Sequence, residues 1–157
     1  CLSKNKTLLI YISMAFGNPY GDAWSADLAA SWMEKLNSNI GINHFALADT
    51  VGQSTDLVIK DIFSTVMPAF PNCSIAAHLH STSNETDSKI LAAYKSGCRK
   101  FDSAIHGFGG CPMAEDELVG NVATEKLIEI VEHLESTGLN KEEFNKSLML
   151  ASRVFPS

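Results

Sequence analysis

Residues 74–80 read SIAAHLH, a β-prone run that ends in two histidines separated by one leucine. Alternate residues of a strand point to the same side of a sheet, so His78 and His80 are expected to offer their imidazoles to one point. A lone histidine on a strand is more often structural, but two at this spacing at the end of a strand are typical of metal ligands. The stretch therefore predicts a strand with a metal site at its C-terminal end.

Strand-like and helix-like segments alternate on both sides of this stretch. β-prone runs cover residues 8–12, 44–48, 74–78 and 99–105, and helical patterns cover residues 25–37, 55–67, 86–96, 124–136 and the segment after Asn140. Units of this size imply parallel strands with right-handed crossovers. A complete (β/α)8 barrel needs eight such units and about 250 residues. The pattern therefore predicts an α/β fold that amounts to half of a TIM barrel with an extra C-terminal helix.

Two of the helices carry more detailed expectations. The first has Leu28, Trp32 and Leu36 on one face, which predicts that this face packs on the sheet. The second is expected to stop at Pro68, because proline has no backbone N–H to continue a helix.

The composition narrows the class of protein. The chain has 157 residues, a net charge of −6 and no block of lysine or arginine, which argues against nucleic-acid binding and against an anionic membrane surface. No apolar run approaches the roughly 20 residues that a membrane-spanning helix requires. The four cysteines show no CxxC pairing, which favours a reducing compartment. We therefore expect a globular domain of the cytoplasm, with the mitochondrial matrix as the alternative.

A glycine-dense segment follows the fourth strand-like run. Residues 107–112 read GFGGCP and place Cys111 among glycines, and residues 120–121 read GN. Asp49 also directly follows a strand-like run, and the carboxyl ends of parallel strands are where barrels and open sheets build their sites. Structural roles are the alternatives: Asp49 could form an Asx turn, and Asn121 could cap the next helix. The combination predicts an active site that a thiol-bearing loop closes over.

Five segments, read together, resemble the 3-hydroxy-3-methylglutaryl-CoA lyase family, which belongs to a group of metal-dependent lyases and synthases built on a TIM barrel. The segments are YISMAFGNPYG (11–21), LADTVG (47–52), HLHSTSN (78–84), FDSAIHGFGGCPMA (101–114) and GNVATEKL (120–127). The two-histidine strand is common to the whole group, whereas the glycine loop with Cys-Pro points to the lyase itself. The resemblance covers nearly the whole chain and implies that residues 1–157 form the C-terminal half of the barrel, with the N-terminal half outside this sequence.

The resemblance also implies roles for individual residues. His78 and His80 would be metal ligands, Asn121 a third ligand, and the metal Mg²⁺ or Mn²⁺. Cys111 would be the catalytic thiol on the flexible loop, and Asp49 an acid/base residue beside the acyl-CoA substrate. Asp49 or a neutral His78 could take the proton of the substrate hydroxyl. The implied reaction is cleavage of 3-hydroxy-3-methylglutaryl-CoA to acetyl-CoA and acetoacetate.

The chain departs from the family pattern in ways that leave alternatives open. An Arg-Asp pair from the family's first strand is not in this sequence, so we expect little activity from these residues alone. His106 stands where a small residue is usual, and it could make a supporting hydrogen bond or line the acyl pocket. Exposed strand edges and an exposed apolar barrel interior would favour a homo-oligomer, such as a dimer. The alternatives are a related acyl-CoA or 2-oxoacid aldolase or synthase, resembling isopropylmalate or homocitrate synthase, and a catalytically incomplete metal-binding fragment.

Overall fold

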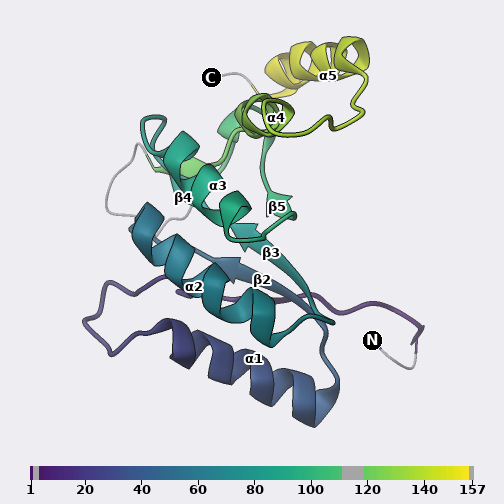
Figure 1. The fold of residues 1–157 in the computed structure, drawn as a ribbon. Coiled ribbons are helices and arrows are strands. Elements are labelled where there is room, and N and C mark those ends of the chain that lie inside the picture. Colours follow the sequence, from purple (N-terminus) through teal and green to yellow (C-terminus); the bar gives the residue numbers. More distant parts are fainter. Residues whose placement is uncertain (2–3, 111–118, 156–157) are drawn as a thin grey trace.

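A parallel four-stranded sheet forms the centre of the molecule in the computed structural model, which describes residues 1, 4–110 and 119–155 (Figure 1). The sheet has the strand order β1-β2-β3-β5, and a separate antiparallel pair joins β4 to β6. The strands are β1 (Ile10–Ile12), β2 (His44–Ala48), β3 (Ser74–His78), β4 (His80–Ser81), β5 (Phe101–Asp102) and β6 (Gly120–Asn121). The helices are α1 (Ala26–Ile40), α2 (Asp56–Ala69), α3 (Thr86–Lys95), η2 (Ile105–Gly107), α4 (Thr124–Glu132) and α5 (Lys141–Val154).

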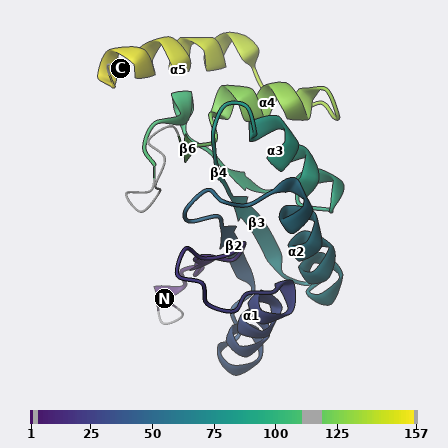
Figure 2. The same cartoon turned by 90° about the vertical axis from the view of Figure 1, so that its left-hand side faces the viewer.

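The order of the strands distinguishes the two architectures that parallel sheets adopt. Each strand of the main sheet lies beside the one before it in the chain, and every pair is parallel. Helices α1, α2 and α3 all lie on one side of the sheet (Figure 2). A doubly wound sheet would reverse its strand order and carry helices on both faces, whereas a barrel keeps one order and one helical face. The arrangement is that of successive units of a barrel wall, as the sequence predicts.

The two faces of the sheet differ in their side chains. In β2 and β3, Phe45 lies in register with Ile75, and both belong to the buried core together with Phe63 of α2. On the opposite face, Tyr11 lies in register with Ala46, which lies in register with Ala76. Both alanines are buried and Tyr11 is exposed. At these positions the open face therefore carries two buried alanines and the exposed aromatic side chain of Tyr11.

The two histidines lie on different strands, although β3 itself ends where the expected run at 74–78 ends. β3 stops at His78, and His80 begins β4, which pairs antiparallel with β6 through the register of His80 with Asn121. The expectation that both histidines alternate on one strand is therefore wrong. The chain changes partner at Leu79, which is buried and anchors the turn in the core.

Two expectations about helices are also wrong. α2 continues through Pro68 to Ala69, because the missing N–H falls in the last turn and costs the helix only one terminal hydrogen bond. In α1 the residues that pack inward include Ala29 and Met33, while Leu28 and Trp32 are exposed. Only Leu36 of the expected face packs against the core.

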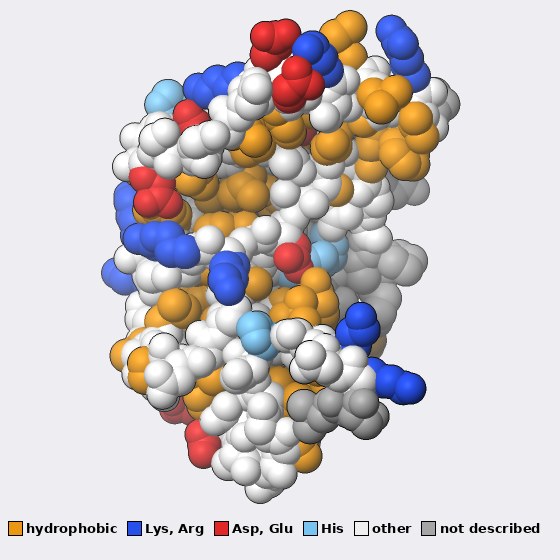
Figure 3. Space-filling model, turned by 90° about the vertical axis from the view of Figure 1, so that its right-hand side faces the viewer, with side chains coloured by type: hydrophobic (Ala, Val, Ile, Leu, Met, Phe, Trp, Pro, Cys, Tyr) orange, Lys and Arg blue, Asp and Glu red, His pale blue; other side chains and the backbone are white. Residues whose placement is uncertain are grey.

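The end of the molecule that holds α4 and α5 has a different surface. Figure 3 shows hydrophobic side chains gathered on the surface there. Met149, Leu150 and Phe155 of this region are exposed, and no residue of α5 is buried. Among the described residues, none of the helices combines the length and hydropathy needed to cross a bilayer. Helix α5 is therefore attached to the rest of the chain by surface contacts rather than by a core.

Candidate functional site

His78 and His80 lie side by side at the carboxyl end of β3, although they belong to different strands. Their ring centroids are 5.1 Å apart and the ring planes are nearly perpendicular, at 89°. A nitrogen binds a divalent ion at about 2.1 Å, so rings this close can both reach one ion. Asn121 lies opposite His80 in the β4–β6 pair. The structure therefore brings together the three residues that the sequence predicted as metal ligands.

The orientation of His80 is set by the main chain of the loop after β2. Its Nδ1 lies 2.9 Å from the backbone oxygen of Asp49. A carbonyl oxygen can only accept, so Nδ1 must carry the proton and donate it. The neutral imidazole then has its lone pair on Nε2. Because His80 is 6% exposed, the surrounding chain holds this arrangement tightly.

The orientation of His78 is set by an acidic side chain. Its Nδ1 lies 3.2 Å from Oδ2 of Asp102 at the end of β5, which also accepts a hydrogen bond of 2.8 Å from the Tyr11 hydroxyl. The hydrogen bond from the hydroxyl to the Asp102 carboxylate raises the pKa of Tyr11 above its usual 10.0, with burial and the negative charge adding to the effect. A carboxylate that accepts from Nδ1 again leaves the lone pair of the neutral ring on Nε2.

Asn121 is held by the glycine loop. Its Nδ2 donates to the backbone oxygen of Phe108 over 2.9 Å, which turns the amide oxygen the other way. A Cβ at Gly107 would lie 2.9 Å from the Asn121 backbone oxygen, and Gly107 has a φ of +65°. Residue 107 lies so close to the strand of Asn121 that only glycine fits at this position.

The donor atoms that His78, His80 and Asn121 carry are of kinds that divalent cations bind. Two Nε2 lone pairs and one amide oxygen are donors that first-row and alkaline-earth divalent ions accept. Among the described residues, no group of three or more histidine, cysteine, aspartate or glutamate side chains is placed to hold a metal ion. The candidate set here consists instead of two histidines and one amide.

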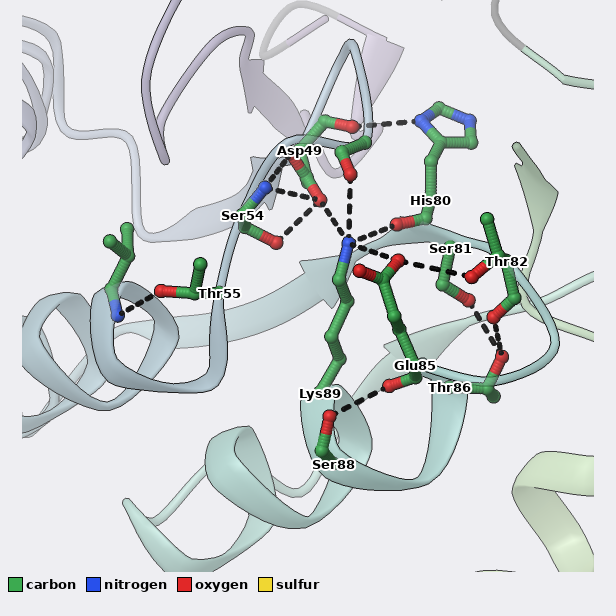
Figure 4. A network of polar contacts seen from close by, with 12 residues as sticks. Asp49, Ser54, Thr55, His80, Ser81, Thr82, Glu85, Thr86, Ser88 and Lys89 are labelled. Carbon is green, nitrogen blue, oxygen red and sulfur yellow. Dashed lines mark hydrogen bonds and ion pairs between the residues drawn. The ribbon is translucent and has the colours of Figure 1, made fainter. Parts of the chain in front are cut away.

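Asp49 occupies a different environment from the imidazoles. Figure 4 shows its carboxylate directed toward Ser54 and Lys89, while its backbone oxygen faces His80. The carboxylate accepts from the Ser54 hydroxyl and N–H, and Oδ2 lies 3.3 Å from Nζ of Lys89. Asp49 and Lys89 are 3% and 1% exposed, respectively, so this ion pair is fully buried. The sequence predicts Asp49 as an acid/base residue. In the structure, its carboxylate already accepts hydrogen bonds from Ser54 and forms an ion pair with Lys89.

His106 is not part of the histidine cluster. Its Nδ1 lies 3.1 Å from Glu125 of α4, and its Nε2 lies 3.1 Å from the backbone oxygen of Leu148 of α5. The residue joins those two helices to the glycine loop, with a left-handed φ of 57°. Cys111, the predicted catalytic thiol, lies outside the described residues.

Sequence reasoning missed Lys89 and Asp102, although each had a signal. Lys89 shares a helical face with the apolar residues Ile90 and Ala93, and a lysine on such a face needs a buried partner. Asp102 ends a strand, as Asp49 nearly does, and the rule that placed the other site residues at strand ends applies equally to it.

Two surface hollows among the described residues lie away from the histidine site. A cavity of about 730 Å³ opens at the opposite end of the sheet, where Leu8, Gly41 and His44 are among its lining residues. A second, of about 340 Å³, lies between α4 and α5 and includes Phe144 and His133. The histidine site is recognised by its donors and their hydrogen bonds.

Comparison with known proteins agrees with the resemblance seen in the sequence. The HMGL-like family model matches residues 9–152. The mitochondrial hydroxymethylglutaryl-CoA lyase of Homo sapiens is 35% identical over 142 residues, which are 90% of this chain and 43% of the relative. The cytoplasmic 3-hydroxy-3-methylglutaryl-CoA lyase of Rattus norvegicus is 37% identical over 83% of this chain and 36% of the relative. The (R)-citramalyl-CoA lyase of Chloroflexus aurantiacus is 33% identical over 79% of this chain and 38% of the relative.

Solved structures agree with the fold. The HMG-CoA lyase of Bacillus subtilis superposes with a TM-score of 0.85 at 27% identity, over 99% of this chain and 53% of that chain. An HMG-CoA lyase of Acinetobacter baumannii in complex with coenzyme A and 3-methylmalate gives 0.72 at 30% identity, over 85% of this chain and 43% of that chain. The fold class expected from the sequence, half of a (β/α)8 barrel, is confirmed. The chain spans about half the length of these structures and less than half that of the curated relatives.

Proposed function

Because the chain belongs to the HMGL-like family, we propose that it forms the metal-binding half of a lyase that cleaves 3-hydroxy-3-methylglutaryl-CoA to acetyl-CoA and acetoacetate. The identity with hydroxymethylglutaryl-CoA lyases over most of the chain supports this substrate. The chain spans less than half the length of those relatives, and the lyase activity is therefore a proposal for the protein.

The observation that carries the proposal is the state of the two imidazoles. In both His78 and His80, Nδ1 faces an oxygen acceptor, a carboxylate in one case and a backbone carbonyl in the other. Metal-binding histidines usually donate their second ring nitrogen to such an oxygen, which fixes the tautomer and the ring orientation. Two adjacent rings with both Nε2 lone pairs prepared in this way favour a shared cation over a purely structural role.

The proposed metal ligands are His78, His80 and the amide oxygen of Asn121, with Mg²⁺ or Mn²⁺ as the ion. Mn²⁺ accepts imidazole nitrogen more readily than Mg²⁺, which prefers oxygen ligands. A bound divalent cation would supply Lewis acidity to the hydroxyl and carboxylate oxygens of the substrate.

Cleavage moves one proton off the substrate and one proton on. The tertiary hydroxyl loses its proton as the C2–C3 bond breaks, and the enolate of acetyl-CoA then takes a proton at carbon. We propose the Cys111 thiol as the donor in the second step, since an ordinary thiol with a pKa of about 8.5 still holds its proton at neutral pH.

The first proton needs a base, and the geometry separates the two candidates. If His78 binds metal through Nε2, neither ring nitrogen is left to take a proton, since Nδ1 donates to Asp102. We therefore propose His78 as a ligand. Asp49 stays the proposed acid/base residue only if its carboxylate can release a hydrogen bond from Ser54 or Lys89 during the reaction. Its present contacts favour an anchoring role.

A second candidate function is a related lyase that acts on another acyl-CoA. The identity with (R)-citramalyl-CoA lyase favours it, because that relative is nearly as similar over most of the chain. An acyl-CoA is the proposed substrate in either case, and the relative solved with coenzyme A supports it. We further propose a homo-oligomer and a cytoplasmic location, although the relatives' names include mitochondrial and cytoplasmic forms.

The test measures Mn²⁺ binding by the 157-residue chain, with electron paramagnetic resonance as the readout and the ionic strength held constant. We expect His80→Ala to weaken binding by at least tenfold, because it removes a ligand. His44→Ala, a histidine at the other end of β2, serves as the matched control and should leave binding unchanged. Equal affinity of the parent chain and His80→Ala would refute the metal site. Product analysis with both acyl-CoA substrates, on a protein that also contains the family's Arg-Asp pair, separates the two lyases.

A further inference from the structure

Lys89 is the one lysine among the described residues whose side chain is buried in the core, at 1% exposed. It projects from α3 into the space between the loop after β2 and the start of β4 (Figure 4). Burying an ammonium group without partners is costly, so the chain must hold it for a reason. Nothing in the proposed reaction uses this cation.

We propose that Lys89 is a positioning residue that holds His80 in its metal-binding orientation, an inference that rests on the proposed metal site. The ammonium contacts both sides of the hydrogen bond that orients the His80 ring. Its Nζ lies 3.0 Å from the backbone oxygen of His80 and 3.3 Å from Oδ2 of Asp49. A third contact, of 2.9 Å, goes to the backbone oxygen of Gly52.

The contacts account for every donor of the group. An ammonium has three N–H bonds, and three oxygens accept them, two of them buried and that of Gly52 partly buried. The more distant Glu85 carboxylate, 3.9 Å away, is half exposed and adds little. With its donors used and no access to solvent, Lys89 has nothing to offer a substrate phosphate or carboxylate. Its role must therefore be internal to the protein.

The link from Lys89 to the His80 ring passes through Asp49. The Asp49 carboxylate is tied to Lys89 and Ser54, and the backbone oxygen of the same residue accepts from Nδ1 of His80. Lys89 also donates to the backbone oxygen of His80. One side chain thus fixes both Asp49, whose backbone oxygen is the acceptor, and the strand of His80, whose ring is the donor. Loss of Lys89 would free both ends of the hydrogen bond that sets the tautomer of His80.

The residues around the contacts of Lys89 are closely packed. A Cβ at Gly52 would lie 3.4 Å from Cβ of His80 and 2.4 Å from a side-chain carbon of Val119. The loop after β2 therefore runs directly against β4 and the chain that leads into β6. A small shift of the loop would be passed to His80 and to Asn121, its partner across the β4–β6 pair.

The test compares Lys89→Met with the double variant Asp49→Asn/Lys89→Met. The single change leaves a buried carboxylate without its cation and could prevent folding, whereas the double change removes both charges and keeps the volume. We expect the folded double variant to bind Mn²⁺ 10- to 100-fold more weakly, the range seen when a residue that orients a metal ligand is lost. Lys126→Met is the matched control, since Lys126 has the same 3.3 Å ion-pair distance, to Asp87, but at the surface. It should bind as the parent chain does.

A second readout, without metal, separates this inference from the proposed function. Nitrogen-15 chemical shifts report which ring nitrogen of His80 carries the proton. The parent chain and Lys126→Met should show the proton on Nδ1, and the double variant should show a mixture of tautomers. A folded double variant with the parent's His80 signature and Mn²⁺ affinity would overturn the role of Lys89. A parent chain that shows the signature but binds no Mn²⁺ would instead overturn the metal site.

Discussion

The two histidines of the candidate site are supported in opposite ways. His80 is buried, and a backbone carbonyl orients its ring, with an internal ion pair behind it. His78 is partly exposed, and a side chain orients its ring, with a phenol behind it. Both devices leave the same nitrogen free to bind a metal. Breaking the two arrangements should cost different amounts of unfolding free energy, because water cannot replace the lost partner of a charge in the core.

This contrast shows that the two sides of the site contribute differently to the stability of the fold. The network of Asp49, Ser54 and Lys89 belongs to the fold as much as to the site, so changes there should affect both. The pair of Asp102 and Tyr11 lies at the open face, where water can solvate either group. Changes on that side should affect the site with little effect on folding.

Removal of the Asp49 carboxylate should have the largest effect. Asp49→Ala leaves the Lys89 ammonium buried without its counter-charge, which costs about 3–5 kcal/mol of unfolding free energy. Asp102→Ala removes a carboxylate that is 33% exposed and should cost at most about 1 kcal/mol. Urea denaturation followed by circular dichroism measures both. Equal losses in the two variants would break the comparison between the buried and open sides.

Removal of the Asp102 carboxylate should have an intermediate effect, confined to metal binding. Asp102→Ala takes away the acceptor that orients Nδ1 of His78, so we expect Mn²⁺ affinity to fall by about tenfold. The same variant should unfold at nearly the parent's urea concentration. An unchanged affinity would mean that His78 either is no ligand or needs no acceptor to be one.

The smallest effect concerns alkaline pH. Because Asp102 raises the pKa of Tyr11 above 10.0 in the folded chain, the folded state holds this proton more tightly than the unfolded state does. The stabilisation is complete below pH 10 and is lost as the pH rises through the higher, folded-state pKa. Ultraviolet titration of the phenolate, with Tyr11→Phe as the reference, should give a lower midpoint in Asp102→Ala. A midpoint that does not move would show that Asp102 is not the cause.

The elements and the site were predictable to different degrees. The bounds of β2 and β3 coincide with the expected runs at 44–48 and 74–78, because buried parallel strands read as continuous apolar segments. The inward face of α1 was not predictable from Leu28 and Trp32, since periodicity locates an apolar face but does not say which of two faces the sheet will cover.

The site shows the same division. His78 and His80 lie side by side and Asn121 lies opposite His80, even though the strand breaks between the two histidines. Their role as metal ligands stays a prediction. The partners that orient them were not predicted. Lys89 lies on helix α3 and Asp102 on strand β5, and no local pattern says which groups a distant lysine or aspartate will contact.

The sequence by itself determined the chemistry available to this protein: two imidazoles, an amide, a thiol and glycines, in an order that resembles the HMGL-like family. Tertiary structure alone decided how each group is used. The hydrogen bonds that place a proton on Nδ1 and the ion pair that ties α3 to the loop after β2 join residues distant in the chain. Such contacts depend on the packing of strands and helices against one another, which local propensity does not specify.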